Sequence, residues 1–390
     1  MSRSVIVKSA VGFGAMVLLA SLLAGCPRRR AREAAARPAA EATYDVGPLL
    51  GSLRDEVRRQ LPGKLGAARL AMLPLYRIDL DQDPQRGRLS GQCELHYRNN
   101  TGQPLSLLPL LLHPNAPREL GVAGEAGELT ITAVKARRGP EVRSKVRRPT
   151  LVELRFARPL AAGERVVVQL TFDGRLRRLP AGSNDVFSQA LAALGVGGSG
   201  SGASDYGLLA MGDGLATVAS AYPMVAPFRQ GQFDRGPPTP FGDLAYNTLA
   251  NYQVRITVPS GYQLVTNLAD RTLEEGRGHL ALGAANRDFV LVAGRQLRRV
   301  RRKVGPVEVT SVFTAGDREG GERALSAAVD ALRLFERRLG PYPSRELDVA
   351  EATLVGGAGG VEFPGMVLIA GMLYRPPSRS DNPLALMMRG

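Results

Sequence analysis

The residues best suited to do chemistry lie in one stretch, Gly356 to Ile369, which reads Gly-Gly-Ala-Gly-Gly-Val-Glu-Phe-Pro-Gly-Met-Val-Leu-Ile. It places one carboxylate, Glu362, between a cluster of glycines and an apolar segment, 366–370, that is typical of a short strand. Because glycine has no side chain, an extended peptide can approach such a backbone closely, and a lone carboxylate there could hold the peptide's free amine. The alternative interpretation is an ordinary mobile loop, since glycine clusters commonly mark loops.

This stretch resembles the aminopeptidase N type of zinc peptidase, in which a Gly-x-Met-Glu-Asn strand binds the substrate's N-terminus and a His-Glu-x-x-His helix follows. The matching residues are Gly359, Gly360, Val361, Glu362 and Phe363. The resemblance implies that Glu362 anchors the α-amine and that Gly359 and Gly360 contact the substrate backbone. The Met and Asn of the motif are replaced by Val361 and Phe363, and the second replacement bears on aminopeptidase specificity.

The residues that would hold a catalytic zinc are missing from the sequence. Such a site needs three protein ligands, and the common helical solution has two histidines four residues apart. The chain has only His96, His113 and His279, none within four residues of another. A site built from Cys93, His96 and His113 is disfavoured because Cys93 and His96, three apart in an expected strand, point to opposite faces.

No other nucleophile is indicated, because the chain has no G-x-S-x-G motif and no reactive-cysteine context. Glu351 is the second well-placed carboxylate. We therefore expect no catalytic residue and no metal ligand within these 390 residues, although the resemblance implies zinc as cofactor and a peptide as substrate. Two hypotheses follow: a membrane-anchored zinc aminopeptidase present without its metal-binding part, and inactive alone, or a non-catalytic periplasmic module that binds peptides or acts as a scaffold. The chain's end soon after Asp381-Asn382-Pro383 favours the first.

The composition is that of a globular protein, with 44% hydrophobic and 22% charged residues and a formal net charge of +15. Lysine occurs only at Lys8, Lys64, Lys135, Lys145 and Lys303, and the arginines are scattered rather than interleaved with aromatic residues. This distribution argues against a nucleic-acid partner. The two concentrated basic runs are 28–30 and 298–303, and we expect the second to lie at a domain junction.

Residues 1–26 have the pattern of a targeting segment, with Arg3 and Lys8 before an apolar stretch, 11–20. The segment ends in Leu23-Ala24-Gly25-Cys26, which resembles the lipobox of bacterial lipoproteins and implies lipidation at Cys26. The resemblance places the protein in the cell envelope, anchored to lipid; Pro27 in place of Asp points to the outer membrane, facing the periplasm. Cys93 would then be the remaining cysteine, a small buried hydrophobe with no disulfide partner.

The remaining pattern predicts a mainly β protein, with an antiparallel sheet domain followed by an α/β segment. The resemblance to the aminopeptidase N type implies that these are a β-sandwich or saddle domain and the start of a thermolysin-like α/β catalytic domain. A tether rich in Ala, Arg and Pro over 27–45 precedes a helical leader, 46–70, in which Leu49, Leu53, Val57 and Leu61 recur every four residues. The β domain spans 71–303. Its expected strands are 75–80, 89–97, 105–112, 129–134, 151–156, 166–172, 252–258 and 289–293.

Within that domain we expect a flexible insertion at about 178–205. It contains Gly195 to Gly200, which fits G-x-G-x-x-G but lacks the strand before and the helix after that a dinucleotide site needs. The catalytic-domain start spans 304–390, with a strand at 307–313, a helix at 322–339, and strands at 347–350 and 366–370. Several segments resemble the family's β domain, among them "RIDLDQDPQRGRLSGQCELHYRNN" and "NYQVRITVPSGYQLV".

Overall fold

The computed structural model describes residues 44–64, 66–121, 126–181, 206–239, 247–273 and 278–375. All of these residues belong to one compact unit, Glu41–Gly390. The expected targeting segment, Cys26, most of the tether and the glycine-rich stretch 195–200 lie outside the described residues. No helix among the described residues is long and apolar enough to cross a membrane.

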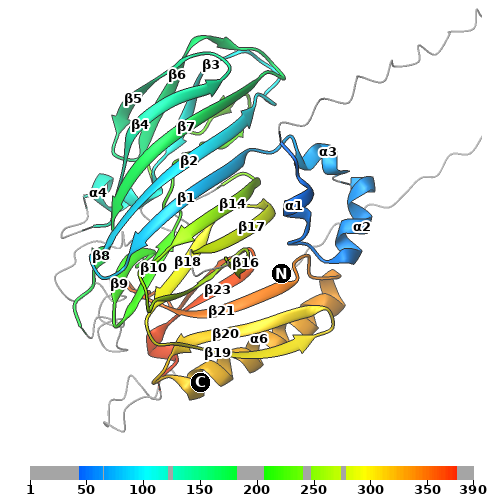
Figure 1. Cartoon of the computed structure of the whole chain (residues 1–390), viewed down its shortest axis with the longest axis vertical. Helices are drawn as coiled ribbons and strands as arrows, with labels where there is room; N and C mark the ends of the chain where they lie inside the picture. The colour runs from blue at the N-terminus through cyan, green and yellow to red at the C-terminus, as the bar shows by residue number, and fades with distance from the viewer. Residues whose placement is uncertain are drawn as a thin grey trace, which may run out of the picture. The chain divides into compact units, whose positions relative to one another are not determined.

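The largest sheet has seven strands in the order β16-β17-β14-β1-β2-β7-β4 (Figure 1). Their bounds are β1 (Leu75–Asp83), β2 (Arg88–Arg98), β4 (Glu128–Arg138), β7 (Arg165–Arg175), β14 (Ala250–Thr257), β16 (Ala269–Thr272) and β17 (His279–Asn286). In β1, Tyr76, Ile78 and Leu80 are buried and Asp79 and Asp81 are exposed, as a period of two requires. Neighbouring strands are antiparallel except for β1 and β14, which are parallel.

Two smaller sheets pack on the apolar face of this large sheet. One has the order β11-β3-β6-β5, and the other β15-β18-β10-β9-β8. Their bounds are β3 (Leu105–Leu111), β5 (Val142–Arg148), β6 (Leu151–Leu160), β8 (Arg177–Arg178), β9 (Leu209–Gly212), β10 (Leu215–Ala219), β11 (Met224–Val225), β15 (Gln263–Thr266) and β18 (Val290–Gly294). One hydrophobic core joins all three sheets, with Cys93, Leu108, Leu154, Phe172 and Leu291 fully buried in it. A hairpin of β12 (Phe228–Arg229) and β13 (Gln232–Phe233), a short 3-10 helix η1 (His113–Asn115) and α4 (Ala116–Glu119) complete this part.

The C-terminal part is a mixed five-stranded sheet with one long helix, in the order β19-β20-β21-β23-β22. Its elements are β19 (Leu297–Val304), β20 (Val307–Thr314), α6 (Arg318–Leu339), β21 (Glu346–Ala352), β22 (Gly360–Phe363), β23 (Met366–Ala370) and the 3-10 turn η3 (Gly371–Leu373). Strands β20, β21 and β23 are parallel. Leu325, Val329 and Leu332 of α6 pack on Val307 and Val309, and the helix ends where Gly340 takes a φ of 98°. The predicted fold class, a mainly β part followed by an α/β segment, is confirmed.

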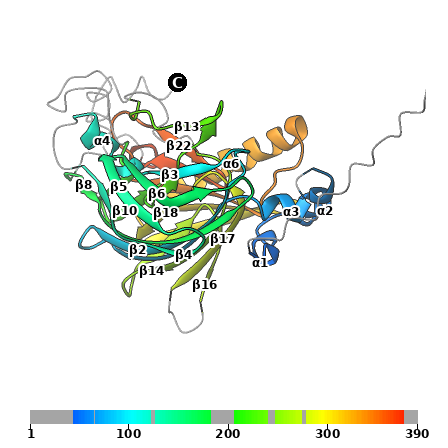
Figure 2. The same cartoon turned by 90° about the horizontal axis from the view of Figure 1, so that it is seen from above.

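The leader differs from the single amphipathic helix that its four-residue repeat predicts. It forms α1 (Gly47–Leu50), α2 (Asp55–Lys64) and α3 (Gly66–Leu70), seen at the side of the sheets in Figure 2. The helix is interrupted because Leu53 bridges to Ser344 and the Arg54 N–H donates to the Pro343 carbonyl at 3.1 Å. The backbone of this segment therefore pairs with the turn after α6 rather than within a helix.

Candidate functional site

Strand β22, which carries Glu362, lies at the end of the C-terminal sheet. It pairs on one side with β23, antiparallel, with Glu362 opposite Val367 and Gly360 opposite Ile369. Its other side has no strand neighbour among the described residues. Strand β23 is interior, between β21 and β22.

The backbone of β22 offers specific groups to an added strand. The Gly359 carbonyl accepts a hydrogen bond from the Ala370 N–H at 3.0 Å, so Gly359 is turned toward β23. In an antiparallel ladder the residues alternate between facing the partner and facing away. Gly360 and Glu362 therefore direct their N–H and C=O groups outward, where an extended peptide could pair with them.

The side chain of Glu362 is exposed and no described residue forms an ion pair with it. The neighbouring Val361 and Phe363 point the other way and pack on the core beneath β10 and β18. Cross-strand partners share a face, so Glu362 lies beside Val367 on the face of the sheet that α6 covers further along. Among the described residues, nothing pairs with this carboxylate or with the outer edge of its strand.

The glycines around this strand have distinct roles. Gly356 and Gly357 have φ values of 71° and 82°, a conformation that side chains disfavour, and they shape the turn before β22. A Cβ at Gly360 would lie 3.3 Å from the Leu368 carbonyl oxygen, whereas one at Gly359 would make only an ordinary contact, 3.7 Å from Leu373 Cδ1.

Glu351, the second carboxylate, lies two strands away and is locked in a network. It stands opposite Ile369 in register, and its Oε2 accepts hydrogen bonds from the Thr314 N–H at 2.8 Å and hydroxyl at 3.0 Å. Arg375 lies 3.4 Å from its Oε1 and also pairs with Asp317 at 3.2 Å. Burial, together with the negative charge of Asp317, raises the pKa of Glu351 to about 7. Glu351 is therefore engaged in structural contacts, whereas Glu362 has no ion-pair partner among the residues that the structure describes.

The three histidines do not come together. Cys93 and His96 of β2 do point to opposite faces: Cys93 is in the core, and His96 Nε2 lies 2.6 Å from Glu94 Oε1 on the outer face. His113 is in η1 and His279 in β17. Among the described residues, no group of His, Cys, Asp and Glu is arranged to hold a metal ion. The zinc that the resemblance implies has no ligand set in this part of the chain.

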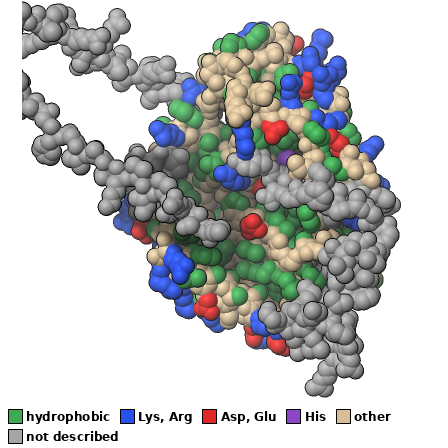
Figure 3. All heavy atoms as spheres, turned by 180° about the vertical axis from the view of Figure 1, so that it is seen from behind, with side chains coloured by type: hydrophobic (Ala, Val, Ile, Leu, Met, Phe, Trp, Pro, Cys, Tyr) green, Lys and Arg blue, Asp and Glu red, His purple; other side chains and the backbone are tan. Residues whose placement is uncertain are grey.

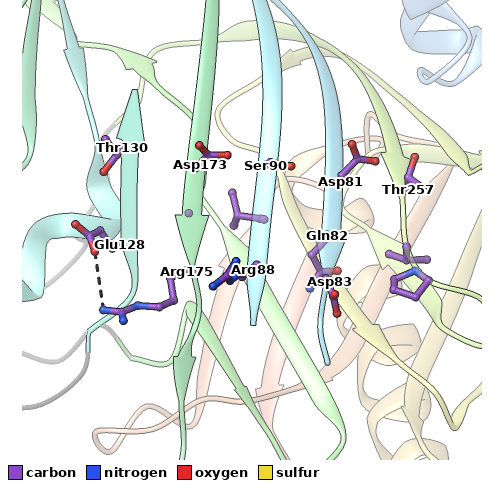
Figure 4. A pocket seen from close by; sticks show the side chains of 14 residues that line it. Asp81, Gln82, Asp83, Arg88, Ser90, Glu128, Thr130, Asp173, Arg175 and Thr257 are labelled. Atoms are coloured by element: carbon purple, nitrogen blue, oxygen red, sulfur yellow. Dashed lines mark ion pairs between the residues drawn. The ribbon is translucent and has the colours of Figure 1, made fainter. Parts of the chain in front are cut away.

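A hollow of about 850 Å³ lies elsewhere, on the outer face of the seven-stranded sheet. Figure 4 shows its polar side chains arising from adjacent strands, with Asp81, Ser90 and Asp173 in one cross-strand row. Glu128 and Arg175 in it are 3.9 Å apart. None of the predicted site residues lines this hollow, and the sequence contains no motif that would have indicated it.

Basic side chains are dispersed on the surface seen from behind. Figure 3 shows Lys and Arg in separate groups toward the margin of that face, with hydrophobic side chains gathered nearer its middle. The basic run 298–303 forms most of β19, the first strand of the C-terminal sheet, with Arg301 Nε 3.5 Å from Glu308 Oε1 of β20.

No family model matches this sequence, and no curated protein matches it. Solved structures are similar to it over about three quarters of its length. One is a mutant M1 zinc metallopeptidase from Deinococcus radiodurans bound to a Tyr-Ser-Ala substrate, with 20% identity and a TM-score of 0.47 over 76% of this chain and 60% of that chain. Another is the M1 zinc metallopeptidase from the same organism, with 19% identity and a TM-score of 0.46 over 77% and 60%.

A third is a two-domain mutant M1 zinc metallopeptidase bound to L-tryptophan, with 20% identity and a TM-score of 0.48 over 77% of this chain and 60% of that chain. The chain thus spans about three fifths of the length of the solved structures it matches. These three solved structures are all M1 zinc metallopeptidases.

Proposed function

We propose that β22 binds the N-terminal end of a peptide by strand addition, with the Glu362 carboxylate pairing with the peptide's α-ammonium group. The observation that carries the proposal is a free carboxylate on an open strand edge whose outward backbone groups belong to Gly360 and Glu362 itself. Backbone pairing supplies affinity that is independent of peptide sequence. The charged pair supplies selectivity for a free N-terminus.

In this proposal the complete protein is a zinc aminopeptidase that removes residues from the N-terminus of peptides. When bound, zinc would polarise the scissile carbonyl and activate water. The described residues contribute substrate binding: β22 fixes the direction of the peptide, and Glu362 fixes where its N-terminus stops. The ligands for the metal are not among them.

A Glu362→Gln variant tests the role of the carboxylate. Binding of a short peptide with a free N-terminus and of its N-acetylated form is measured by fluorescence anisotropy on the 390-residue chain. A charge-assisted hydrogen bond contributes roughly 1.5–3 kcal/mol, so we expect affinity for the free-amine peptide to fall about 10- to 100-fold and that for the acetylated peptide to change little. Glu319→Gln, which removes another exposed carboxylate, is the matched control and should change neither. Equal losses on both peptides would refute the assignment.

The alternative function, a non-catalytic peptide-binding or scaffold module, uses the same strand edge. The two functions differ in metal content. Zinc measured by mass spectrometry in protein purified from its natural source, together with release of N-terminal residues from a peptide, would support the enzyme. Peptide binding without zinc and without cleavage would support the module.

We further propose that the protein is a lipoprotein anchored through Cys26, at the outer membrane facing the periplasm. The motif Leu23-Ala24-Gly25-Cys26 supports this, and several acyl chains on one residue would give stable attachment. Labelling with a radioactive fatty acid should mark the natural protein and not a Cys26→Ala variant. Equal labelling of both would rule out this anchor.

A further inference from the structure

Three arginine side chains converge on one buried carboxylate, Glu153, on the outer face of the four-stranded sheet. Arg155 Nη2 donates a hydrogen bond to Glu153 Oε2 at 2.9 Å, and Arg235 Nη1 donates to Glu153 Oε1 at 3.2 Å. Arg147 Nε lies 3.3 Å from Glu153 Oε2. The Glu153 side chain is only 2% exposed, whereas the three arginine side chains, here called the arginine cluster, are between 41% and 50% exposed. A buried acid thus holds three guanidinium groups at the surface.

Strand alternation places the acid and one arginine on the same face of the sheet. Val152 and Leu154 of β6 are buried in the core, so Glu153 and Arg155 project from the opposite face. Strands β5 and β6 lie side by side (Figure 1). Lys145 of β5 stands opposite Glu153 in their pairing, and its side chain is exposed. Because paired residues share a face, Lys145 lies beside the arginine cluster.

The other two arginines are supplied by a bulge and by a loop. The pairing of β5 with β6 shifts between Val146 and Arg148, which makes Arg147 the extra residue of a β-bulge. A bulge turns a side chain out of the regular alternation, and Arg147 reaches the acid in this way. Arg235 belongs to the loop after β13, and Arg148 Nη2 holds this loop against β5 by donating to the Gly236 carbonyl. Two strands and a loop therefore build the cluster together.

The buried acid does not neutralise the arginine cluster. Three guanidinium groups and one carboxylate leave an excess of two positive charges, and the ammonium group of Lys145 adds a third. Burial acts to raise the pKa of Glu153, but the hydrogen bond from Arg155 and the charges of the cluster outweigh it and lower the pKa, so the acid stays ionised. Asp234, in the same loop as one of the arginines, is exposed and offsets one charge at most. A positive excess therefore remains where the cluster meets solvent.

The cluster keeps hydrogen-bond donors and space for a ligand. A guanidinium group has five N–H donors in a planar fork. Arg155 and Arg235 each give one nitrogen to Glu153, and their side chains are half exposed, so other N–H groups reach solvent. Arg235 also lines a hollow of about 400 Å³ at the β12–β13 hairpin, together with Arg229 and Phe233. A bound group could therefore lie beside the cluster.

We propose that the arginine cluster binds a phosphate group, carried by a phosphate monoester or a diphosphate. Guanidinium forks match pairs of phosphate oxygens, and an excess of two to three positive charges matches a dianion better than a single carboxylate. Glu153 acts as a positioning residue, because it orients the arginines from below. The phosphate could belong to a soluble compound or to the headgroup of a lipid. The cluster lies in a different sheet from β22 and does not depend on what β22 binds.

Calorimetric titration of the 390-residue chain with pyrophosphate tests the site with a soluble probe. Charge-assisted hydrogen bonds to phosphate are strong, so Arg155→Gln and Arg235→Gln should each weaken the binding of pyrophosphate about ten-fold. Arg235 lies in a loop, so its variant keeps the test valid if Arg155→Gln fails to fold.

Arg77→Gln is the matched control, because Arg77 is 42% exposed and pairs with Glu94 in the seven-stranded sheet. It removes the same charge at a distant place. We expect it to change the affinity for pyrophosphate less than about two-fold at physiological salt, because distant exposed charges are screened.

Vesicles distinguish the two sources of phosphate. Co-sedimentation of a Cys26→Ser chain with phosphatidylcholine vesicles that contain phosphatidic acid measures binding to a lipid phosphate monoester. Vesicle binding that Arg235→Gln weakens about ten-fold and Arg77→Gln leaves unchanged would assign the phosphate to a headgroup. Saturable binding of pyrophosphate without vesicle binding would assign it to a soluble compound. Binding of neither probe, or equal weakening by Arg235→Gln and Arg77→Gln, would overturn the proposal.

Discussion

Arg54 ties the leader to the turn after α6, and its removal gives a prediction whose size follows from the structure. Its Nη1 donates to Glu336 Oε1 at 2.5 Å and to the Tyr342 carbonyl at 3.0 Å, and its side chain is only 8% exposed. Glu336 Oε1 also accepts from the Tyr342 N–H at 3.0 Å. The ion pair between Arg54 and Glu336 therefore holds the leader against the C-terminal end of α6.

Replacing Arg54 by Met keeps much of the apolar stem but removes the two short hydrogen bonds to Glu336 and Tyr342, together with a longer one, 3.4 Å, to the exposed Glu56. Each such bond contributes roughly 1.5–3 kcal/mol, and the two share one guanidinium, so we expect a loss of about 3 kcal/mol in the free energy of unfolding. Glu336→Gln keeps an acceptor for the Tyr342 N–H and should cost about 1–2 kcal/mol. The double variant should show a coupling energy of about 1–2 kcal/mol, since the residues interact directly.

The free energies are obtained from urea unfolding followed by far-ultraviolet circular dichroism, because the chain has no Trp for fluorescence. The control is Arg58→Met. Arg58 pairs with Asp55 on the surface, with side chains 47% and 56% exposed, so its loss should cost below about 0.5 kcal/mol. A coupling energy below about 0.5 kcal/mol between positions 54 and 336 would show that the leader is held by its apolar contacts and refute this reasoning.

Two further predictions concern buried groups of the large sandwich. Asp288 accepts hydrogen bonds from the Ser220 and Tyr222 hydroxyls, and burial raises its pKa from 3.8 to about 6. The stabilising contribution of protonated Asp288 is therefore present below about pH 4 and lost as the pH rises to about 6. Asp288→Asn should flatten the pH dependence of the unfolding free energy over this range by up to about 3 kcal/mol. Identical pH profiles for the variant and the natural chain would contradict this prediction. Cys93 is fully buried, and burial raises the pKa of its thiol. In a Cys26→Ser variant, a thiol reagent should therefore label Cys93 only as fast as the protein unfolds. Rapid labelling of the folded protein would disprove this prediction.

The parts of the fold that the sequence predicts well are those where one face of a strand or helix is buried. Alternation in Tyr76, Ile78 and Leu80 indicates β1, and apolar residues at helical spacing indicate α6, because burial on one side imposes a period on the sequence. Strand β5 lacks such a period: its residues are exposed or half-buried, and it pairs through its backbone with β6. Strand β19 is similar, since its arginines are exposed, Val300 is half-buried and only Leu297 and Val304 are buried.

The candidate site was predicted only in part. The short strand β22 was indicated by the resemblance of Gly359 to Phe363 to a known motif, since a four-residue strand leaves little periodic signal. The structure adds that Gly360 and Glu362 face outward, which depends on register with β23 and cannot be read from local sequence. Asp348 of β21 looks like an ordinary polar residue of a strand, and its burial results from contact between two sheets distant in sequence.

The break in the leader has the same kind of cause. Leu49, Leu53 and Val57 have a helical spacing, but the strand-like bridge from Leu53 to Ser344 competes with the helix for the same backbone groups. The tertiary contact between Leu53 and Ser344 thus overrides the helix propensity of this segment.

The parallel pairing of β1 with β14 constrains when the molecule can fold during synthesis. Leu75 pairs with Asn251, so the centre of the seven-stranded sheet stays open until the chain up to Thr257 has left the ribosome. Contacts of such long range slow folding, because a large loop must close before they form. Until then one side of β1 is an unpaired edge with apolar residues beside it, a surface prone to join with other chains. The nascent chain therefore exposes this edge for about two thirds of its synthesis, long before the strand that carries Glu362 is made.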